Sequence, residues 1–486
     1  MFTSTAIASI LPEILILLVG MLLLVVEPFW KEEQRRNAGW LTAGGLLLSL
    51  ILSLLFGQPG EPVTTLGGMV RFDWLGFFFK LLFMFAGVAT SLLLMDNEKV
   101  GDRGEAYILL LASLIGMNLM AASADLIMLY LAIETTSIPL YVLSGFMLAN
   151  EKSTEAGFKY LLFGALTSTI MLYGFSLLFG FAGTTNLYEL AALFNEGTLS
   201  PFVALGVLAL ILVGLGFKAS VVPLHFWAPD VYEGAPTPVA GFLSTASKAA
   251  GFAVLVRLFF VIFPDPQVEL ARGWAIAIAI IAVITMTVGN LLALPQTNIK
   301  RLIAYSSIAH AGYALIGVVA LTQLGAASVV FYLAAYIATN LLAFGIVMAF
   351  SRVTGLEDLK DYAGMSRRSP WLGLMMLSAF LSLAGMPPFA GFVAKIFVFA
   401  AGIQAGYVWL VIVGIINSII GVYYYLNALK YVYLYRMPDQ DEENHPIPMT
   451  HPYAIALAVL TIGVILIGTI FAPWFSWSDA AALNLF

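Results

Sequence analysis

Long apolar stretches recur about fourteen times along this sequence and are separated by short polar segments. A helix needs about 20 mostly apolar residues to cross a bilayer. Only 10% of the residues are charged, whereas a typical soluble domain carries about 25%. Such a chain cannot cover a water-facing surface with polar groups, which excludes a soluble globular protein. We therefore predict an all-α, polytopic membrane protein with about 14 transmembrane helices. The predicted spans are 7–28, 39–57, 73–95, 106–121, 125–149, 157–181, 202–222, 237–263, 273–292, 302–321, 326–350, 371–401, 406–429 and 452–472.

Lysine and arginine are distributed very unequally between the loops on the two sides of the predicted bundle. Cytoplasmic loops of membrane proteins carry an excess of these residues. One side receives fourteen: Lys31, Arg35, Arg36, Lys99, Arg103, Lys152, Lys300, Arg301, Arg352, Lys360, Arg367, Arg368, Lys430 and Arg436. The other side receives two, Arg71 and Arg272. We predict that the first side is cytoplasmic and that both termini face the opposite side. The first span lacks the basic start of a cleavable signal peptide, so we expect it to be retained.

Several kinds of chemistry are excluded by what the sequence lacks. It has no cysteine and only four histidines. Disulfides, cysteine-ligated iron–sulfur clusters and thiol catalysis are therefore impossible on this chain. The glycine-rich phosphate motifs and the HExxH zinc motif do not occur either. We predict no cofactor-binding site and no metal site on this polypeptide.

Six cations remain within the predicted spans after the sixteen loop cations are set aside, and one acid lies near the middle of a span. They are Lys80, Lys159, Lys218, Lys248, Arg257, Lys395 and Glu134. An ionised group at the bilayer centre costs about 2.5–3.5 kcal/mol on insertion scales. These side chains must therefore face one another or a hydrated interior, and the default interpretation of such groups is an ion or proton path.

The structural alternative differs from residue to residue. Arg257 and Lys80 can extend toward the membrane surface, and we favour structural roles for both. Lys159 lies near the start of its span and could do the same, but a functional role is preferred. His225 follows the Lys218 region closely and is also assigned to function, whereas both interpretations are left open for His310.

Helix-breaking residues lie beside three of these charges. Pro139 follows Glu134 by five residues, and Pro223 follows Lys218 by the same interval. The segment 385–389, GMPPF, precedes Lys395. Proline lacks an N–H and disrupts a helix, and irregular backbone at membrane depth is tolerated only where protein or a water-filled cavity covers it. We predict two broken helices, one next to Lys218 and one next to Lys395.

The order of spans suggests an internal repeat. Five spans within 106–263 are followed by five more within 273–430, and because five is odd the second set starts from the opposite face. This arrangement is typical of inverted-topology repeats in transporters. We predict a three-helix segment at 1–100, two inverted five-helix repeats at 106–263 and 273–430, and a loop with the last helix at 431–486.

The segments around the first broken helix carry a family resemblance. They read GFKASVVPLHFWAPDVYEGAPTPV over 216–239 and LSTASKAAG over 243–251, with supporting motifs at 131–134, 300–313 and 383–395. The chain closely resembles the antiporter-like subunits of respiratory complex I (proton-pumping NADH-quinone oxidoreductase) and, within them, the subunit N family, the counterpart of mitochondrial subunit 2. The short end after the last span, and Lys395 where the M-type subunit has glutamate, favour subunit N.

The resemblance implies a proton path and a role for each residue on it. Glu134 would be the acid of the fifth span, and Lys159 would be the lysine of the sixth, which helps connect to a neighbouring subunit. Lys218 would be the lysine of the first broken helix, and His225 would be a histidine on the water wire. Lys248 would be the central relay lysine, and Lys395 would be the lysine next to the exit. We expect Glu134 to pair with Lys218 and to set its proton affinity. His225 and water would then pass the proton on.

The same resemblance implies partners and a location. Electron transfer from NADH to quinone would take place in other subunits, which would hold the NADH, FMN, iron–sulfur clusters and quinone. The expected neighbours are another antiporter-like subunit and the small quinone-proximal subunits, in the bilayer of a bacterial inner membrane and without nucleic acid. Two alternatives remain open. One is a subunit of a multisubunit sodium (cation)/proton antiporter, and the other is a structural membrane scaffold. The quinone type, electron donor, proton stoichiometry and use of sodium also stay open.

Overall fold

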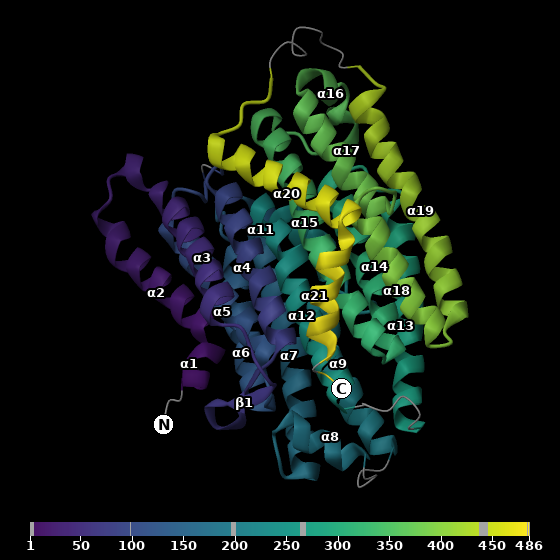
Figure 1. Ribbon diagram of the computed structural model, residues 1–486. Coiled ribbons are helices and arrows are strands. Elements are labelled where there is room, and N and C mark those ends of the chain that lie inside the picture. The colour runs from purple at the N-terminus through teal and green to yellow at the C-terminus, as the bar shows by residue number, and fades with distance from the viewer. Residues whose placement is uncertain are drawn as a thin grey trace.

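The computed structural model describes residues 4–97, 99–195, 201–262, 269–436, 446–483 and 485, which form a bundle of mostly aligned helices (Figure 1). Among these residues, thirteen helical segments are long and apolar enough to cross a membrane. They are α2 (Leu11–Val26), α3 (Asn37–Phe56), α4 (Trp74–Leu94), α5 (Gly104–Ala122), α6 (Leu126–Ser144), α7 (Glu151–Ala182), α9 (Pro201–Ala219), α11 (Thr237–Phe242) continuing through η4 (Leu243–Ser247) into α12 (Lys248–Ile262), α13 (Glu269–Ala293), α14 (Ile299–Ala320), α15 (Gln323–Thr354), α19 (Val408–Tyr433) and α20 (His451–Thr469).

The remaining elements are short. They are α1 (Ser4–Ser9), η1 (Glu27–Phe29), η2 (Glu32–Gln34), β1 (Val63–Thr65), η3 (Leu66–Gly68), β2 (Val70–Phe72), α8 (Leu187–Asn195), α10 (Trp227–Gly234), η5 (Leu359–Tyr362), α16 (Met365–Arg368), α17 (Pro370–Ala384), α18 (Ala390–Gln404) and α21 (Phe471–Leu483). Each predicted span matches a helical segment, although the last residue of span 237–263 lies outside the described residues. The polytopic helical fold is therefore confirmed. The two strands among the described residues, β1 and β2, form an antiparallel hairpin in which Val63 pairs with Phe72.

Polar residues fix where several spans begin. Asp73, Asp125, Asn150 and Asn298 each accept hydrogen bonds from backbone N–H groups in the first turn of the following helix. These N–H groups have no partner within the helix, and such caps stabilise a helix by about 1 kcal/mol. The apolar runs therefore form helices whose starting points are set by single Asp or Asn residues.

Both predicted helix breaks are confirmed. The first separates α9 from α10, and Ser220 adopts a left-handed backbone there, with φ of 57°. The second divides the predicted span 371–401 into α17 and α18 at Gly385, with φ of 82°. Pro139, in contrast, lies inside α6, which continues through it. A further irregularity was not predicted: η4, a π-helical turn directly before Lys248.

The centre of the bundle is formed by the segment α11–η4–α12 together with α14 and α15, which are almost entirely buried. The helices α2, α6, α7, α13 and α19 lie around it and expose leucine, isoleucine and phenylalanine outward. Apolar side chains on the outer surface suit a lipid environment. The division into two inverted repeats stays a prediction.

The loops rich in lysine and arginine meet at one end of the bundle, which we call the basic face. Ion pairs join them: Asp96 binds both Arg36 and Arg352, and Lys300 pairs with Glu357. This end carries α16 at the top of Figure 1, whereas α1, the β hairpin, α8 and the end of α21 lie at the opposite end. The first and last described helices thus lie at the same end, away from the basic face.

The C-terminal region differs from the prediction of a single last span. Helix α20 crosses the front of the bundle obliquely and α21 turns to run along it (Figure 1). α20 packs on α4, α15, α17 and α18, and α21 packs on α15 and α4. The residues after 472 therefore form a second helix, which covers the central helix α15.

Candidate functional site

Lys218 lies at the end of α9, directly before the first break. Its side chain is buried, and its Nζ donates a hydrogen bond to the Ser137 hydroxyl of α6 at 2.9 Å. Gly251 of α12 packs against it so closely that an added Cβ would lie 3.1 Å from the lysine Cγ. The lysine is thus held between three helices by a neutral partner.

Glu134 lies one turn before Ser137 on α6, and it forms no direct ion pair with Lys218 among the described residues. Its Oε1 atom is buried and has no hydrogen-bond partner among the described residues. The carboxylate remains close enough for its charge to act on Lys218. The direct contact of the Lys218 ammonium is therefore with Ser137, and the expected influence of Glu134 on this lysine acts through charge without a hydrogen bond.

Lys248 begins α12 immediately after the π-helical turn η4. Its Nζ donates to both the backbone carbonyl and the hydroxyl of Ser307 on α14, each at 2.8 Å. The side chain is buried at the centre of the bundle. π-helical turns often occur at functional sites, and this one aligns a lysine with a polar strip of α14.

Lys395 lies on α18 and reaches back across the second break. Its Nζ donates to the carbonyls of Leu383 and Ala384 at 3.1 and 3.0 Å, which the end of α17 leaves free, and to the Ser418 hydroxyl at 2.9 Å. A Cβ at Gly385 would lie 3.0 Å from this nitrogen. The positive φ and this close approach both require glycine at position 385.

A polar strip on α14 lies between Lys248 and Lys395. Ser307, His310 and Tyr313 are three residues apart, so they share one face of the helix. His310 is hydrogen-bonded through Nδ1 to the Tyr332 hydroxyl at 2.6 Å and through Nε2 to the Tyr425 hydroxyl at 3.2 Å. The Lys395 ammonium lies 5.0 Å from the centre of the Tyr313 ring. His310, whose role was left open, thus lies within the network that connects the two lysines.

Between Lys218 and Lys248 the structure places Tyr232 of α10. Its buried hydroxyl lies near the hydroxyls of Ser220, in the break, and Ser307, the partner of Lys248, but forms no hydrogen bond among the described residues. His225 is partly buried in the same break; its Nδ1 has no hydrogen-bond partner among the described residues, and it does not bond to either lysine. The path role of His225 stays a prediction, and Tyr232 is a residue that the sequence did not single out.

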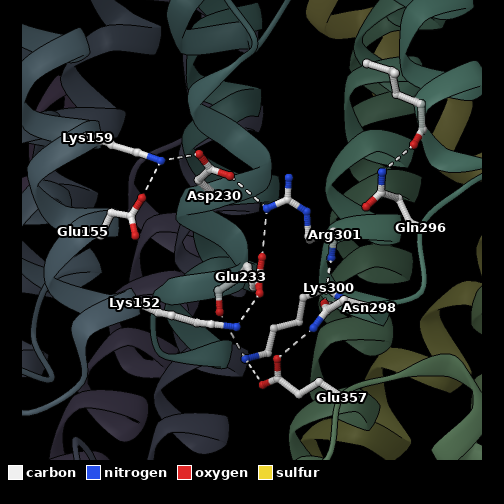
Figure 2. Close-up of polar contacts among 11 residues, drawn as sticks. Lys152, Glu155, Lys159, Asp230, Glu233, Gln296, Asn298, Lys300, Arg301 and Glu357 are labelled. Atoms are coloured by element: carbon white, nitrogen blue, oxygen red, sulfur yellow. Dashed lines mark hydrogen bonds and ion pairs between the residues drawn. The ribbon is translucent and has the colours of Figure 1, made fainter.

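Lys159 belongs to a different group of charges. It pairs with Glu155, on its own helix, and with Asp230 of α10, both at 2.6 Å, and its side chain is 33% exposed. Arg301 at the start of α14 binds Asp230 and Glu233, which also accepts from Lys152 (Figure 2). These ion pairs connect α7, α10 and α14 at the basic face, so Lys159 is not joined to the lysine row by any contact between described residues.

The acids of this charged cluster are held in their ionised form. Burial acts to raise the pKa of Glu233, but hydrogen bonds and charge from Lys152 and Arg301 outweigh it and lower the pKa overall. The pKa of Asp230 is likewise lowered, because Lys159 and Arg301 more than offset its burial. The acids and bases of this cluster therefore remain ionised, as a network of ion pairs, at neutral pH.

Two other buried cations are closed ion pairs. Lys80 contacts Glu13 at 2.7 Å, with side chains 4% and 7% exposed. Arg257 binds both carboxylate oxygens of Asp73 at 2.7 and 2.8 Å and also the carbonyl of Ala121. The expectation that Lys80 and Arg257 extend to the surface is wrong, since both are buried, but their paired geometry supports the structural roles.

The described residues contain no group of three or more histidine, cysteine, aspartate or glutamate side chains suited to a metal ion. The residues that the sequence did not reveal are mainly hydroxyls, such as Ser137, Ser307 and Tyr232. Serine and tyrosine inside apolar spans are common, so composition does not mark them. Their only sequence signal is helical spacing, with Ser137 three residues after Glu134 and Ser307 three before His310.

This architecture has clear counterparts among known proteins. Residues 123–421, more than half of the chain, match the family described as "NADH:quinone oxidoreductase/Mrp antiporter, TM". "NADH-quinone oxidoreductase subunit N" of Moorella thermoacetica is 42% identical over 476 residues, which cover 98% of both chains. A chain of respiratory complex I from Thermus thermophilus has a TM-score of 0.79 at 32% identity, covering 96% of this chain and 98% of that one. A chain of the Mrp complex from Dietzia has a TM-score of 0.85 at 20% identity, covering 100% and 98%, and shares the fold.

Interrupted helices and a central row of buried lysines, together with these matches, define an antiporter-like membrane subunit. Full-length identity of about 40% to named relatives places it more narrowly. The chain belongs to the subunit N family of NADH-quinone oxidoreductase, respiratory complex I.

Proposed function

We propose that this chain carries protons across the membrane as a subunit of an NADH-quinone oxidoreductase. This role is supported most directly by the neutral hydrogen-bond partners of three buried lysines, Lys218, Lys248 and Lys395. Among the described residues, these three lysines are held by hydroxyls and carbonyls, and none forms an ion pair with an acid. A buried ammonium without a fixed counter-charge can give up its proton at far lower cost than a paired one.

The contrast with the closed pairs supports this division. Lys80 and Arg257 sit against carboxylates in the same buried environment. Removing a proton from either would leave an uncompensated buried acid, which is costly. The chain therefore contains two kinds of buried cation, and only the kind with neutral partners is suited to transport.

The proposed path starts at Glu134, whose charge acts on Lys218. A change in the charge or position of Glu134 alters the proton affinity of that lysine. The proton then passes the break by way of Tyr232, His225 and water to Lys248. From there the Ser307–His310 strip leads to Lys395 and the second break.

The energies involved are of the required size. Moving one charge against 100 mV costs about 2.3 kcal/mol. A shift of two pKa units in a buried group corresponds to about 2.7 kcal/mol. Rearranging the charges along the lysine row is therefore sufficient, on this scale, to move a proton against the membrane potential.

The redox step is assigned to partner subunits, which hold the NADH, FMN, iron–sulfur clusters and quinone. Without cysteine, this chain cannot ligate such clusters through thiolates. The neighbours are other membrane subunits of the complex, in a bacterial inner membrane. The basic face is assigned to the cytoplasm on the positive-inside rule, and Lys159, which is partly exposed, is placed near a neighbouring subunit.

The test is proton uptake into sealed inverted vesicles that carry the assembled complex, measured together with NADH-quinone turnover. Lys218→Ala is expected to abolish most of the pumping while the complex still assembles. Lys360→Ala is the matched lysine control, because the Lys360 side chain is 73% exposed. A complex with this substitution should pump normally. Unchanged pumping in assembled Lys218→Ala would contradict the proposed path.

A further inference from the structure

A large polar cavity opens on the basic face directly above the central helices. Its volume is about 960 Å³, and it is lined by charged side chains that include Lys152, Glu233 and Lys300. It is also lined by residues 234–237, which run from the end of α10 to the first residue of α11, and by Met348 of α15. Water and protons from this side of the membrane can therefore enter the protein as far as the first turn of α11.

A second polar group lies deeper on the same two helices. The Asn340 amide of α15 donates to the Ser244 hydroxyl of η4 at 2.8 Å and to the Tyr336 hydroxyl at 3.0 Å. Tyr336 lies beside the hydroxyl of Ser307, which binds Lys248. Hydrogen bonds thus join Asn340 to Tyr336 and Lys248 to Ser307, and the two pairs lie next to each other as a polar ladder toward the central lysine.

Asn340 has an unexplained feature at the upper end of this ladder. The residue is fully buried, yet its Oδ1 atom has no hydrogen-bond partner among the described residues. A buried amide oxygen without a protein partner is costly unless water satisfies it. The ladder therefore ends in the Asn340 Oδ1 atom, an acceptor that a water molecule from outside the ladder would satisfy.

A short apolar barrier separates the cavity from the ladder. Thr237, which lines the cavity, and Ser244 are seven residues apart, which is about 10 Å along a helix. Phe344 of α15 fills the interval: a Cβ on Gly241 would lie 3.1 Å from the Cβ of Phe344. The Phe344 ring also meets the Tyr232 ring edge-on, with centroids 6.1 Å apart. Leu341 of α15 lies at the same place, with its Cδ2 3.5 Å from the Cβ position on Gly241, so Phe344 and Leu341 together separate the aqueous cavity from the buried polar groups.

We propose that this cavity is the entrance of a second proton route, which runs past Phe344 to Asn340 and reaches Lys248 without passing Lys218. Phe344 is the gate: when its ring turns away from the Tyr232 ring that it now meets, water connects the cavity to the Asn340 oxygen. Asn340 is a positioning residue that orders this water above Tyr336 and Ser307. The inference rests on the proposed role of Lys248 and adds a point of entry to it.

The absence of native cysteine allows a direct test of access. Ser244→Cys is introduced alone and together with Phe344→Ala, and the assembled complex in sealed vesicles is treated with a membrane-impermeant, positively charged methanethiosulfonate. Modification of this subunit is followed by its mass. Ala246→Cys, buried on the same π-helical turn, is the matched control for depth.

Reagent added on the basic side is expected to modify Ser244→Cys about tenfold faster when Phe344 is alanine, a change of about 1.4 kcal/mol in the access barrier. Ala246→Cys should stay unmodified in both backgrounds. Equal rates for the two cysteines in the Phe344→Ala background, or modification only from the opposite side, would overturn the route.

Pumping assays separate this inference from the proposed function. In the Lys218→Ala background, Asn340→Leu is expected to lower the remaining pumping about tenfold, whereas Asn118→Leu, at a buried asparagine of α5, should leave that remainder unchanged. If Lys248→Ala abolishes pumping but Ser244→Cys is never modified, only the entrance is overturned. If Ser244→Cys is modified but the Lys248→Ala complex pumps normally, the proposed role of Lys248 is contradicted. The proposed proton route through Lys248 is then contradicted as well.

Discussion

The Lys248 ammonium donates two hydrogen bonds to one residue, Ser307, through its hydroxyl and its backbone carbonyl, each at 2.8 Å. Both acceptors are neutral, and they lie on the helix that carries His310. The central lysine is thus oriented toward the next titratable group of the row. Its orientation depends on a serine that no charge pattern in the sequence would reveal.

Ser307→Ala is therefore expected to lower proton pumping several-fold. The substitution removes the hydroxyl that holds Lys248 and leaves only the carbonyl bond. The measurement is the ratio of protons moved to NADH oxidised in sealed vesicles. Ser328→Ala on α15 also removes a buried hydroxyl, one bonded to the Gly325 carbonyl, and should not change this ratio. Equal ratios in the two variants would show that the hydroxyl of Ser307 is dispensable.

Tyr232→Phe should slow transfer between Lys218 and Lys248, because it removes the hydroxyl that lies between Ser220 and Ser307. We expect pumping to fall while the aromatic packing of the ring is kept. Tyr453→Phe is the control, since Tyr453 is a buried tyrosine bonded to the Gly345 carbonyl, outside the row. If His225→Phe alone stops pumping and Tyr232→Phe does not, the path across the break runs through the histidine.

Glu134→Gln is expected to reduce pumping less than Lys218→Ala does. The carboxylate acts on Lys218 at a distance, with Ser137 interposed. Loss of the charge therefore changes the proton affinity of the lysine without removing the carrier itself. Initial pumping rates of the two variants, at matched complex content, give the comparison, and a larger loss in Glu134→Gln would indicate a direct role in transfer.

Asp73→Ala should destabilise the folded subunit strongly. The bidentate contact with Arg257 is fully buried, and breaking such a pair by removing one partner costs about 3–5 kcal/mol. The thermal midpoint of the purified complex, and the amount that assembles, should both fall. Combining Asp73→Asn with Arg257→Met should recover part of the loss, because no uncompensated charge then remains. A midpoint that is unchanged in Asp73→Ala would contradict the structural role.

The charged cluster of Figure 2 should weaken on acidification. The pKa values of Asp230 and Glu233 are lowered in the folded state. Their contribution to stability is therefore complete above about pH 5 and is lost as the pH falls through the lowered values, below the usual value of about 4.3 for glutamate. Thermal midpoints measured from pH 7 to pH 3 should fall less in Glu233→Gln than in the wild type. Parallel curves would mean that Glu233 is not linked to stability.

The sequence predicted the spans, both helix breaks and the buried lysines because each depends on local composition: apolar length, proline position, or a charge in an apolar run. It did not reveal which partners those lysines have. Ser137 and Glu134 are both near Lys218, and only the three-dimensional packing places the hydroxyl closer. The same holds for Lys80 and Glu13, which are 67 residues apart in sequence and form a buried pair. The π-helical turn at 243–247 was also missed, since it carries no proline or glycine.

Arg257 has a consequence for the kind of motion available to this protein. Its guanidinium joins α12 to Asp73, which precedes α4, and to Ala121 near the end of α5. These contacts lie at the end of the bundle opposite the charged cluster. Within that cluster, Arg301 joins α14 to α10. α12, which packs against Lys218, is therefore fastened at one end of the bundle, and α10, which follows the first break, is fastened at the other. A rocking transition of the kind used by many transporters would have to break the Asp73 contact, at about 3–5 kcal/mol, against about 2.3 kcal/mol for one charge moved through 100 mV. We therefore expect protons to move through this subunit by reorientation of side chains and water, without rigid-body movement of the helices.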